Sequence, residues 1–107
     1  MPRRSKSDGA ANSIARWRLH RGHTQEQLAH LTGMTTASIS RIENGKQPYT
    51  QRTLEAIAAR LGCDVSDLLV SHLTPEQIEL RDILRGMSPQ EASRAIRVLR
   101  ALKDSGK

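Results

Sequence analysis

Short helical segments that end at glycine recur along the first 62 residues, and they restrict the fold of this chain more than any other feature. Residues 51–61 show the pattern best, because their apolar side chains follow the helical spacing i, i+3, i+4 and i+7. Glycine at position 62 then ends the segment, since glycine adopts positive φ without strain. No period-2 run of β-branched residues appears, and the turns are typical of helix caps. We therefore predict an all-α fold.

Capping sequences mark the helix starts. Three capping boxes, in which a glutamine or glutamate follows the capping residue by three positions, begin at Thr24, Thr74 and Ser88. The boxes at Thr74 and Ser88 also carry proline at the first helical position. The predicted helices span residues 13–21, the segment from the Thr24 cap to Gly33, the segment from Thr35 or Thr36 to Asn44, and residues 51–61, 65–70, 75–86 and 89–104.

Charge is distributed unevenly over the 107 residues, a length that fits one domain. The chain has 17 Lys and Arg against 11 Asp and Glu, a net charge of +6. Residues 1–52 carry all of this excess, and residues 53–107 are neutral. A basic excess confined to one half of a domain-sized chain points to a polyanion, most often nucleic acid.

Several protein classes are excluded. No apolar run is long enough for a transmembrane helix, and the basic N-terminus is not followed by the apolar segment of a signal peptide. The single cysteine, Cys63, forms no internal disulfide and fits a reducing compartment. We therefore expect a cytoplasmic protein that has no membrane partner. The basic charge described above leads us to expect that it is associated with the nucleoid through DNA binding.

Two short helices joined by a glycine-containing turn form a helix-turn-helix arrangement between Thr24 and Gly45. Ala29 is small where the two helices would cross, and Gly33 permits the sharp turn. Ile39 and Ile42 anchor the second helix. The residues that this leaves facing outward are Thr36, Ala37, Ser40 and Arg41.

The chain resembles the Cro/CI-type helix-turn-helix family of prokaryotic and phage regulators, which is also called XRE. The resemblance rests on the successive motifs TQEQLA, ISRIENGK, TLEAIAARLG and DLL. The resemblance covers about residues 12–70. It implies a five-helix, lambda-repressor-like DNA-binding domain, which two additional C-terminal helices follow here. It also implies double-stranded DNA as the partner, no cofactor and no enzymatic activity.

Residue roles transfer from this resemblance position by position. It implies that the outward-facing residues of the second helix, Thr36, Ala37, Ser40 and Arg41, read base edges in the major groove, with Arg41 able to bind guanine. It implies a buried structural ion pair between Arg18 and Glu43. The residues that match phosphate-binding positions are Gln25, Thr35, Asn44, Lys46 and Arg52.

The chain divides into three parts. We predict that residues 1–11 form a flexible basic arm, either a disordered start or an arm that follows a DNA groove. Residues 12–71 are the DNA-binding domain, and residues 72–107 a helical segment whose apolar stripes serve dimerisation or pack on the core. The candidate dimerisation residues are Ile83, Leu84, Ile96, Leu99 and Leu102.

The sequence gives little support for a metal site or a catalytic site. His20 and His23 have a metal-like spacing with His30 nearby, but no cysteine or carboxylate cluster completes the ligand set. We therefore expect no metal, no cofactor and no catalytic residue. Cys63 is expected to be a small packed residue.

The resulting hypothesis is a sequence-specific transcriptional regulator, a homodimeric repressor that reads a palindromic operator through the second helix of the motif. The alternative is an antitoxin or adaptor that binds a partner protein, a toxin or another regulator, through the C-terminal helices and uses DNA binding for autoregulation. Binding to RNA or to nucleic acid in general is a third hypothesis. The sequence does not identify the operator.

Overall fold

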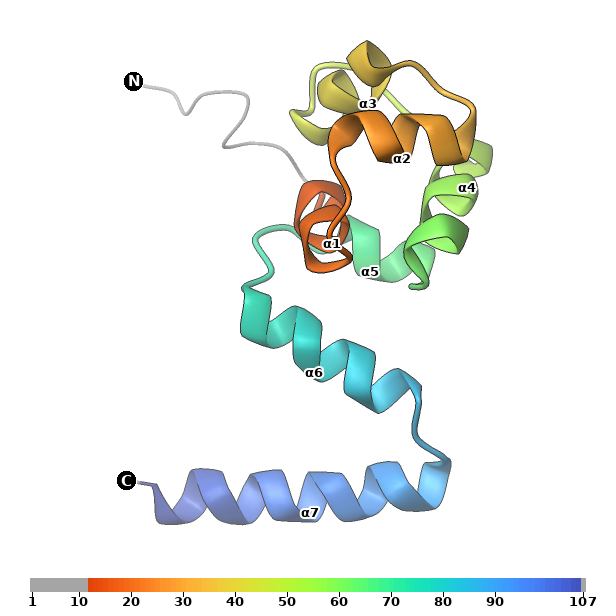
Figure 1. Ribbon diagram of the computed structural model, residues 1–107. Helices are drawn as coiled ribbons and strands as arrows, with labels where there is room; N and C mark the ends of the chain where they lie inside the picture. The colour runs from red at the N-terminus through yellow and green to blue at the C-terminus, as the bar shows by residue number, and fades with distance from the viewer. Residues whose placement is uncertain (1–11, 107) are drawn as a thin grey trace, which may run out of the picture.

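A computed structural model describes residues 12–106, and within that range it contains seven α-helices and no strand (Figure 1). The predicted all-α class is confirmed, and the predicted helix ends agree with the structure to within a residue. The helices are α1 (Ile14–His20), α2 (Gln25–Thr32), α3 (Thr36–Glu43), α4 (Gln51–Leu61), α5 (Val65–Leu69), α6 (Pro75–Arg85) and α7 (Pro89–Ser105).

Side-chain caps explain where the helices begin. The Thr24 hydroxyl accepts a hydrogen bond from the Gln27 amide at 3.0 Å, and the Gln27 side chain accepts one from the Thr24 amide at 2.8 Å. The same reciprocal pattern starts α6 at Thr74 and α7 at Ser88. Thr35 is the cap of α3, which settles the choice between the two threonines. The three predicted capping boxes are therefore present.

Helices α1 to α5 enclose one hydrophobic core. Trp17 of α1 is fully buried, and the core cluster to which it belongs includes residues from all four other helices. The isoleucines of α3 and the apolar face of α4 contribute as their spacing predicts. The buried hydrophobic residues of these helices are Ile14, Trp17, Leu28, Ala29, Ile39, Ile42, Leu54, Ile57, Ala58, Leu61 and Leu68.

Helix α6 packs on this unit through the face that carries Ile78, and not through the face that carries Ile83 and Leu84. Leu73, just before α6, and Ile78 within it are buried in the same core. Because one turn contains 3.6 residues, Leu80, Ile83 and Leu84 lie on the side of α6 opposite Ile78. The division of the chain at residue 71 stays a prediction, but the core itself continues past that residue.

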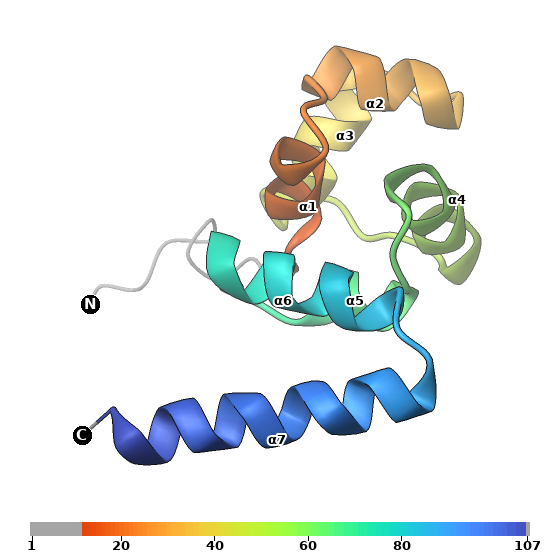
Figure 2. The same ribbon diagram turned by 60° about the horizontal axis from the view of Figure 1, so that its bottom comes forward.

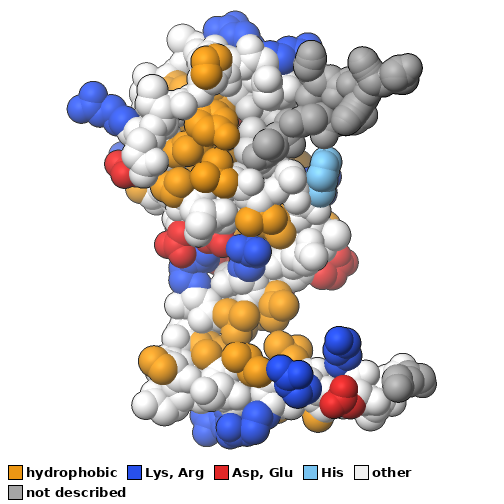
Figure 3. Space-filling model, turned by 180° about the vertical axis from the view of Figure 1, so that it is seen from behind, with side chains coloured by type: hydrophobic (Ala, Val, Ile, Leu, Met, Phe, Trp, Pro, Cys, Tyr) orange, Lys and Arg blue, Asp and Glu red, His pale blue; other side chains and the backbone are white. Residues whose placement is uncertain are grey.

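Helix α7 lies on the far side of α6 from α1 to α5, and none of its residues is buried (Figure 2). Seen from behind, hydrophobic side chains are exposed over the two C-terminal helices (Figure 3). An amphipathic helix normally gains its stability by packing its apolar face against another surface. The exposed large apolar residues of α6 and α7 are Leu80, Ile83, Ile96, Val98, Leu99 and Leu102.

None of the helices within residues 12–106 is both long and apolar enough to cross a membrane. The predicted basic arm, residues 1–11, lies outside the residues that the structure describes.

Candidate nucleic-acid interface

The turn between α2 and α3 has a geometry that only a few residues permit. Gly33 ends α2 in the left-handed region with φ of 73°, where a side chain would be strained. The amide of Met34 then donates to the Ala29 carbonyl at 2.9 Å, which closes the last turn of α2. Ala29 itself is buried. The two helices are thus held at a fixed angle by a glycine turn and a small residue.

Helix α3 has one buried face and one open face. Ile39 and Ile42 are buried and fix the helix on the core. Thr36, Ala37 and Arg41 are exposed. A helix anchored in this way presents a short row of side chains to a ligand that approaches from solvent. The structure thus places three of the four predicted base-reading residues on its open side.

Ser40, the fourth predicted base-reading residue, is half-buried, and its carbonyl accepts a hydrogen bond of 2.9 Å from the Asn44 side chain. Arg41 donates from Nε to the Gln47 side chain at 2.8 Å. This bond leaves the two terminal amino groups of the guanidinium for other partners. Gln47 carries no signal in the sequence, because its contact with Arg41 depends on how the loop after α3 folds back on the helix.

The predicted phosphate-binding residues lie at helix ends and in the loop after α3. Gln25 is the first residue of α2 and donates to the Glu43 carboxylate at 2.9 Å. The Thr35 hydroxyl accepts from the Ser38 amide at 3.0 Å. Asn44 follows the last residue of α3, and Lys46 and Arg52 are exposed. Helix N-termini attract anions, so the ends at Gln25 and Thr35 suit phosphate oxygens.

A buried ion pair connects α1 with α3. Arg18 donates to Glu43 from Nε at 2.7 Å and from Nη2 at 3.2 Å, and from Nη1 to the His23 carbonyl at 2.9 Å. Only 10% of the Arg18 side chain and 4% of the Glu43 side chain are exposed. Since Gln25 also donates to Glu43, this one carboxylate connects α1, α2 and α3. Asn12, which the sequence did not flag, adds a hydrogen bond of 3.0 Å to the Ile42 carbonyl.

Among the residues with a metal-like spacing, His20 is held by contacts with other side chains. His20 contacts Asp82 at 3.1 Å and meets the Trp17 ring edge-on. No group of three or more His, Cys, Asp or Glu side chains in the described part of the chain is placed to hold a metal ion. Cys63 is half-buried, and burial raises the pKa of its thiol to about 12, so the reactive thiolate is disfavoured.

The sequence pattern of a family described as helix-turn-helix matches residues 14–68. The competence pilus inhibition repressor of Acinetobacter baylyi is 37% identical to this chain over 67 residues, which are 61% of this chain and 61% of that protein. This chain therefore matches less than two thirds of the length of that repressor.

Two solved structures are similar to this one. A hypothetical transcription factor from Neisseria is 27% identical, with a TM-score of 0.54 over 75% of this chain and 93% of its own. The clp gene regulator ClgR from Corynebacterium glutamicum has a TM-score of 0.54 over 97% of both chains. Its sequence identity is 20%, so that likeness concerns the fold alone, but it extends over the C-terminal helices as well.

Proposed function

The chain belongs to the helix-turn-helix family of Cro/CI type, whose members are DNA-binding transcription regulators and not enzymes, and from this membership we propose that it is a homodimeric repressor that reads a palindromic operator. In this proposal α3 enters the major groove. Phosphate contacts set its position, and a few base contacts specify the sequence.

The observation that carries the reading role is the division of α3 into two faces. Ile39 and Ile42 are buried, while Thr36, Ala37 and Arg41 are exposed on the other side. Arg41 can donate two hydrogen bonds to O6 and N7 of guanine, and Ala37 can contact a thymine methyl group. The half-buried Ser40 would make a peripheral contact.

Contacts with the DNA backbone would frame these base contacts. Gln25 and Thr35 stand at the N-termini of α2 and α3, where backbone amides and the helix dipole favour a phosphate. Asn44 would contact phosphate at the other end of α3. Lys46 and Arg52 are exposed cations on the loop after α3 and on the first turn of α4. Their charge would act equally on every DNA sequence.

Dimerisation is supported by the free apolar faces of α6 and α7. Helix α6 contacts the core with Ile78, so Ile83 remains exposed, and Leu84 is half-buried. Ile96, Leu99 and Leu102 of α7 are 49%, 41% and 62% exposed. A second copy would cover these side chains, and its α3 would read the second half of the operator about 34 Å away. A single half-site offers too few contacts for tight, specific binding.

The direction of regulation rests on the relative named a repressor, with which this chain shares 37% identity over 67 residues. A repressor of this kind occludes a promoter by occupying an operator within it. Its place of action would be the cytoplasm, where bacterial DNA lies.

The experiment that tests this proposal is selection of bound duplexes from a random-sequence DNA pool, with the full chain as bait. We expect enrichment of one palindrome with half-sites about one helical turn apart. The enriched palindrome, placed in a promoter that drives a reporter, should lower expression when the protein is present. Failure to enrich a palindrome, or raised expression from that promoter, would contradict the proposal.

A partner protein is the competing occupant of the α6 and α7 surface, since the same exposed apolar residues would suit a toxin or another regulator. Sedimentation equilibrium of the purified chain separates the two. A mass of two chains supports the homodimer. A monomer that dimerises only with a co-purified second protein supports the antitoxin or adaptor alternative.

A further inference from the structure

Helix α6 is held on the first five helices by charged side chains in addition to its one buried apolar residue. Ile78 is its one buried residue, and the next residues on the same face are Arg81, Asp82 and Arg85. Arg81 donates to Asp67 of α5 at 2.9 Å, and Arg85 donates to both Asp67 and Asp82. An apolar contact at one end and ionic contacts along the rest thus fix the direction of α6.

Asp82 is the centre of these contacts. Arg21, which follows α1, donates to its two carboxylate oxygens at 2.6 Å and 2.8 Å, and His20 contacts it at 3.1 Å. Arg21 in turn donates to the carbonyls of Leu61 at 2.6 Å and Gly62 at 3.1 Å, where α4 ends. Asp82 therefore connects α6 directly to the end of α1, and through Arg21 to the end of α4.

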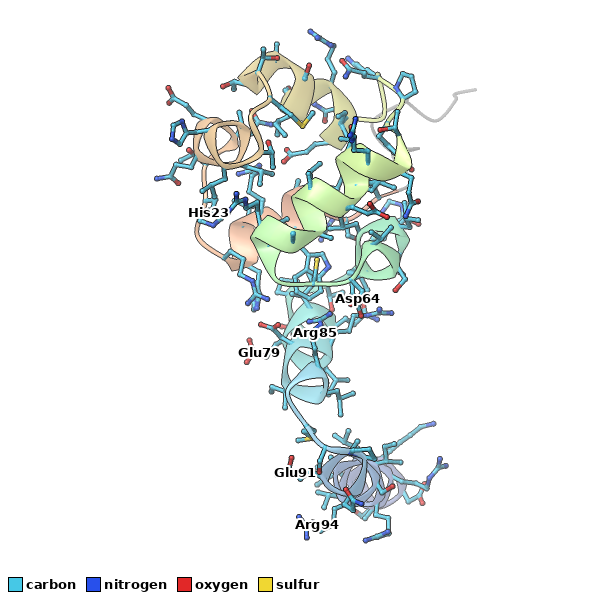
Figure 4. The ribbon with its side chains drawn as sticks, turned by 90° about the vertical axis from the view of Figure 1, so that its right-hand side faces the viewer. His23, Asp64, Glu79, Arg85, Glu91 and Arg94 are labelled. Atoms are coloured by element: carbon cyan, nitrogen blue, oxygen red, sulfur yellow. The ribbon has the colours of Figure 1, made fainter. Side chains whose placement is uncertain are left out.

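The cations of this cluster are themselves held in place. The guanidinium carbons of Arg21 and Arg85 both lie 5.5 Å from the centre of the buried Trp17 ring. Such distances allow a cation–π attraction in addition to the ion pairs. Figure 4 shows Arg85 at the junction between α6 and the first five helices, while Glu79 projects from the side of α6. The side-chain exposure of Asp82 is 24%, so water is partly excluded from its contacts.

The angle of α6 matters because α6 connects the reading unit to α7. It has 11 residues and is therefore about 16 Å long. A tilt of about 10° at its N-terminal end would move its C-terminal end by about 3 Å, close to the rise of about 3.4 Å per base pair. In a dimer joined through the apolar faces of α6 and α7, such a tilt of α6 against the first five helices would change the separation of the two recognition helices.

We propose that Asp82 is a positioning residue which, through Arg21, sets the half-site spacing that the dimer accepts in its operator. This inference rests on the proposed homodimer. Asp82 does not touch DNA in this account, because α6 lies at the opposite end of the unit from α3 (Figure 1). Its loss should therefore relax the spacing of the half-sites and leave their base sequence unchanged.

The test selects duplexes from one random-sequence DNA pool with three full-length proteins: the wild type, Asp82→Ala and the matched control Glu79→Ala. Glu79 is an exposed carboxylate on the same helix. Sequencing gives two independent readouts, the base sequence of each half-site and the centre-to-centre spacing of the enriched palindromes. Asp82→Asn, which keeps the shape of the side chain, is the second variant if Asp82→Ala loses helical circular dichroism.

We expect the wild type and Glu79→Ala to enrich palindromes with a single half-site spacing. One base pair inserted between the half-sites should weaken the binding of these two proteins about tenfold or more. Asp82→Ala should enrich the same half-site over several adjacent spacings, with about threefold loss or less per inserted base pair. A single wild-type spacing for Asp82→Ala, a changed half-site sequence, or the same spread for Glu79→Ala would overturn the inference and leave the homodimer intact. A wild type that enriches no palindrome would instead overturn the proposed function.

Discussion

Arg18 of α1 and Glu43, the last residue of α3, form a buried ion pair through two hydrogen bonds of 2.7 Å and 3.2 Å. This pair ties the helix proposed to read DNA to the first helix of the core. Gln25 reaches the same carboxylate from the start of α2. The Glu43 carboxylate and its two partners thus hold the C-terminal end of α3, in addition to the buried Ile39 and Ile42.

Arg18→Leu should strongly destabilise the protein, because Glu43 would remain buried without its cationic partner. Breaking a buried pair from one side typically costs about 3–5 kcal/mol, whereas replacing both partners with apolar residues is often close to neutral. Urea denaturation followed by circular dichroism measures the free energy of unfolding. The double variant Arg18→Leu/Glu43→Leu should recover most of the loss. A double variant less stable than Arg18→Leu would show that the pair contributes in another way.

Lys46→Ala should weaken binding to all DNA sequences by a similar factor, because an exposed lysine would contact phosphate and not bases. The slope of log affinity against log salt concentration should become shallower by about one unit for each chain of the dimer that contacts DNA. Fluorescence anisotropy at several salt concentrations, with the selected operator and a random duplex, measures both effects. An unchanged slope would remove Lys46 from the DNA interface.

Low pH should weaken the contact between α6 and the core. The hydrogen bond from Arg21, helped by that from His20, lowers the pKa of Asp82 from 3.8 to about 2, against the opposing effect of burial. Because the pKa is lower in the folded state, the contact stabilises the protein above pH 3.8 and is lost as the pH falls toward about 2.

Asp82→Asn should therefore reduce the loss of unfolding free energy between pH 4 and pH 2, measured with urea at each pH. Asp67 also has a lowered pKa, so part of the acid sensitivity should remain in this variant. Glu79→Gln, on the same helix, is the control and should follow the wild type. A pH profile of Asp82→Asn that matches the wild type would contradict the assignment.

Leu99→Glu should convert the proposed dimer to a monomer, because it places a charge within the apolar stripe of α7. Ala101→Glu introduces the same side chain on the opposite side of α7, since the two positions are about 200° apart around the helix. Sedimentation equilibrium should give the mass of one chain for Leu99→Glu and of two chains for Ala101→Glu. A mass of two chains for Leu99→Glu as well would exclude this stripe as the dimer interface.

Much of the fold could be predicted from local signals. The capping boxes, glycine stops and apolar spacing each act within one helical turn, and the structure has the helices where these signals place them. The resemblance to the helix-turn-helix family led to Arg18 and Glu43, which the structure pairs although they are distant in sequence. Periodicity alone would not have joined them.

The attachment of α6 could not be predicted in the same way. Leu80, Ile83 and Leu84 form its apolar stripe, and periodicity cannot say what covers a stripe. The structure turns the other face to the core, where Asp82 meets Arg21 across 61 positions in the sequence. Each of these charged residues alone is typical of a solvated surface. Their partnership exists only in the folded chain.

The base-reading role of Arg41 on α3 is tested by measuring the affinities of the wild type and Arg41→Ala for every single-base variant of the selected operator. We expect Arg41→Ala to lose about 1–3 kcal/mol of binding free energy on the operator and to stop distinguishing bases at one position of each half-site, with all other preferences kept. If Arg41→Ala instead keeps the full base preference of the wild type at every position, α3 does not read bases through Arg41.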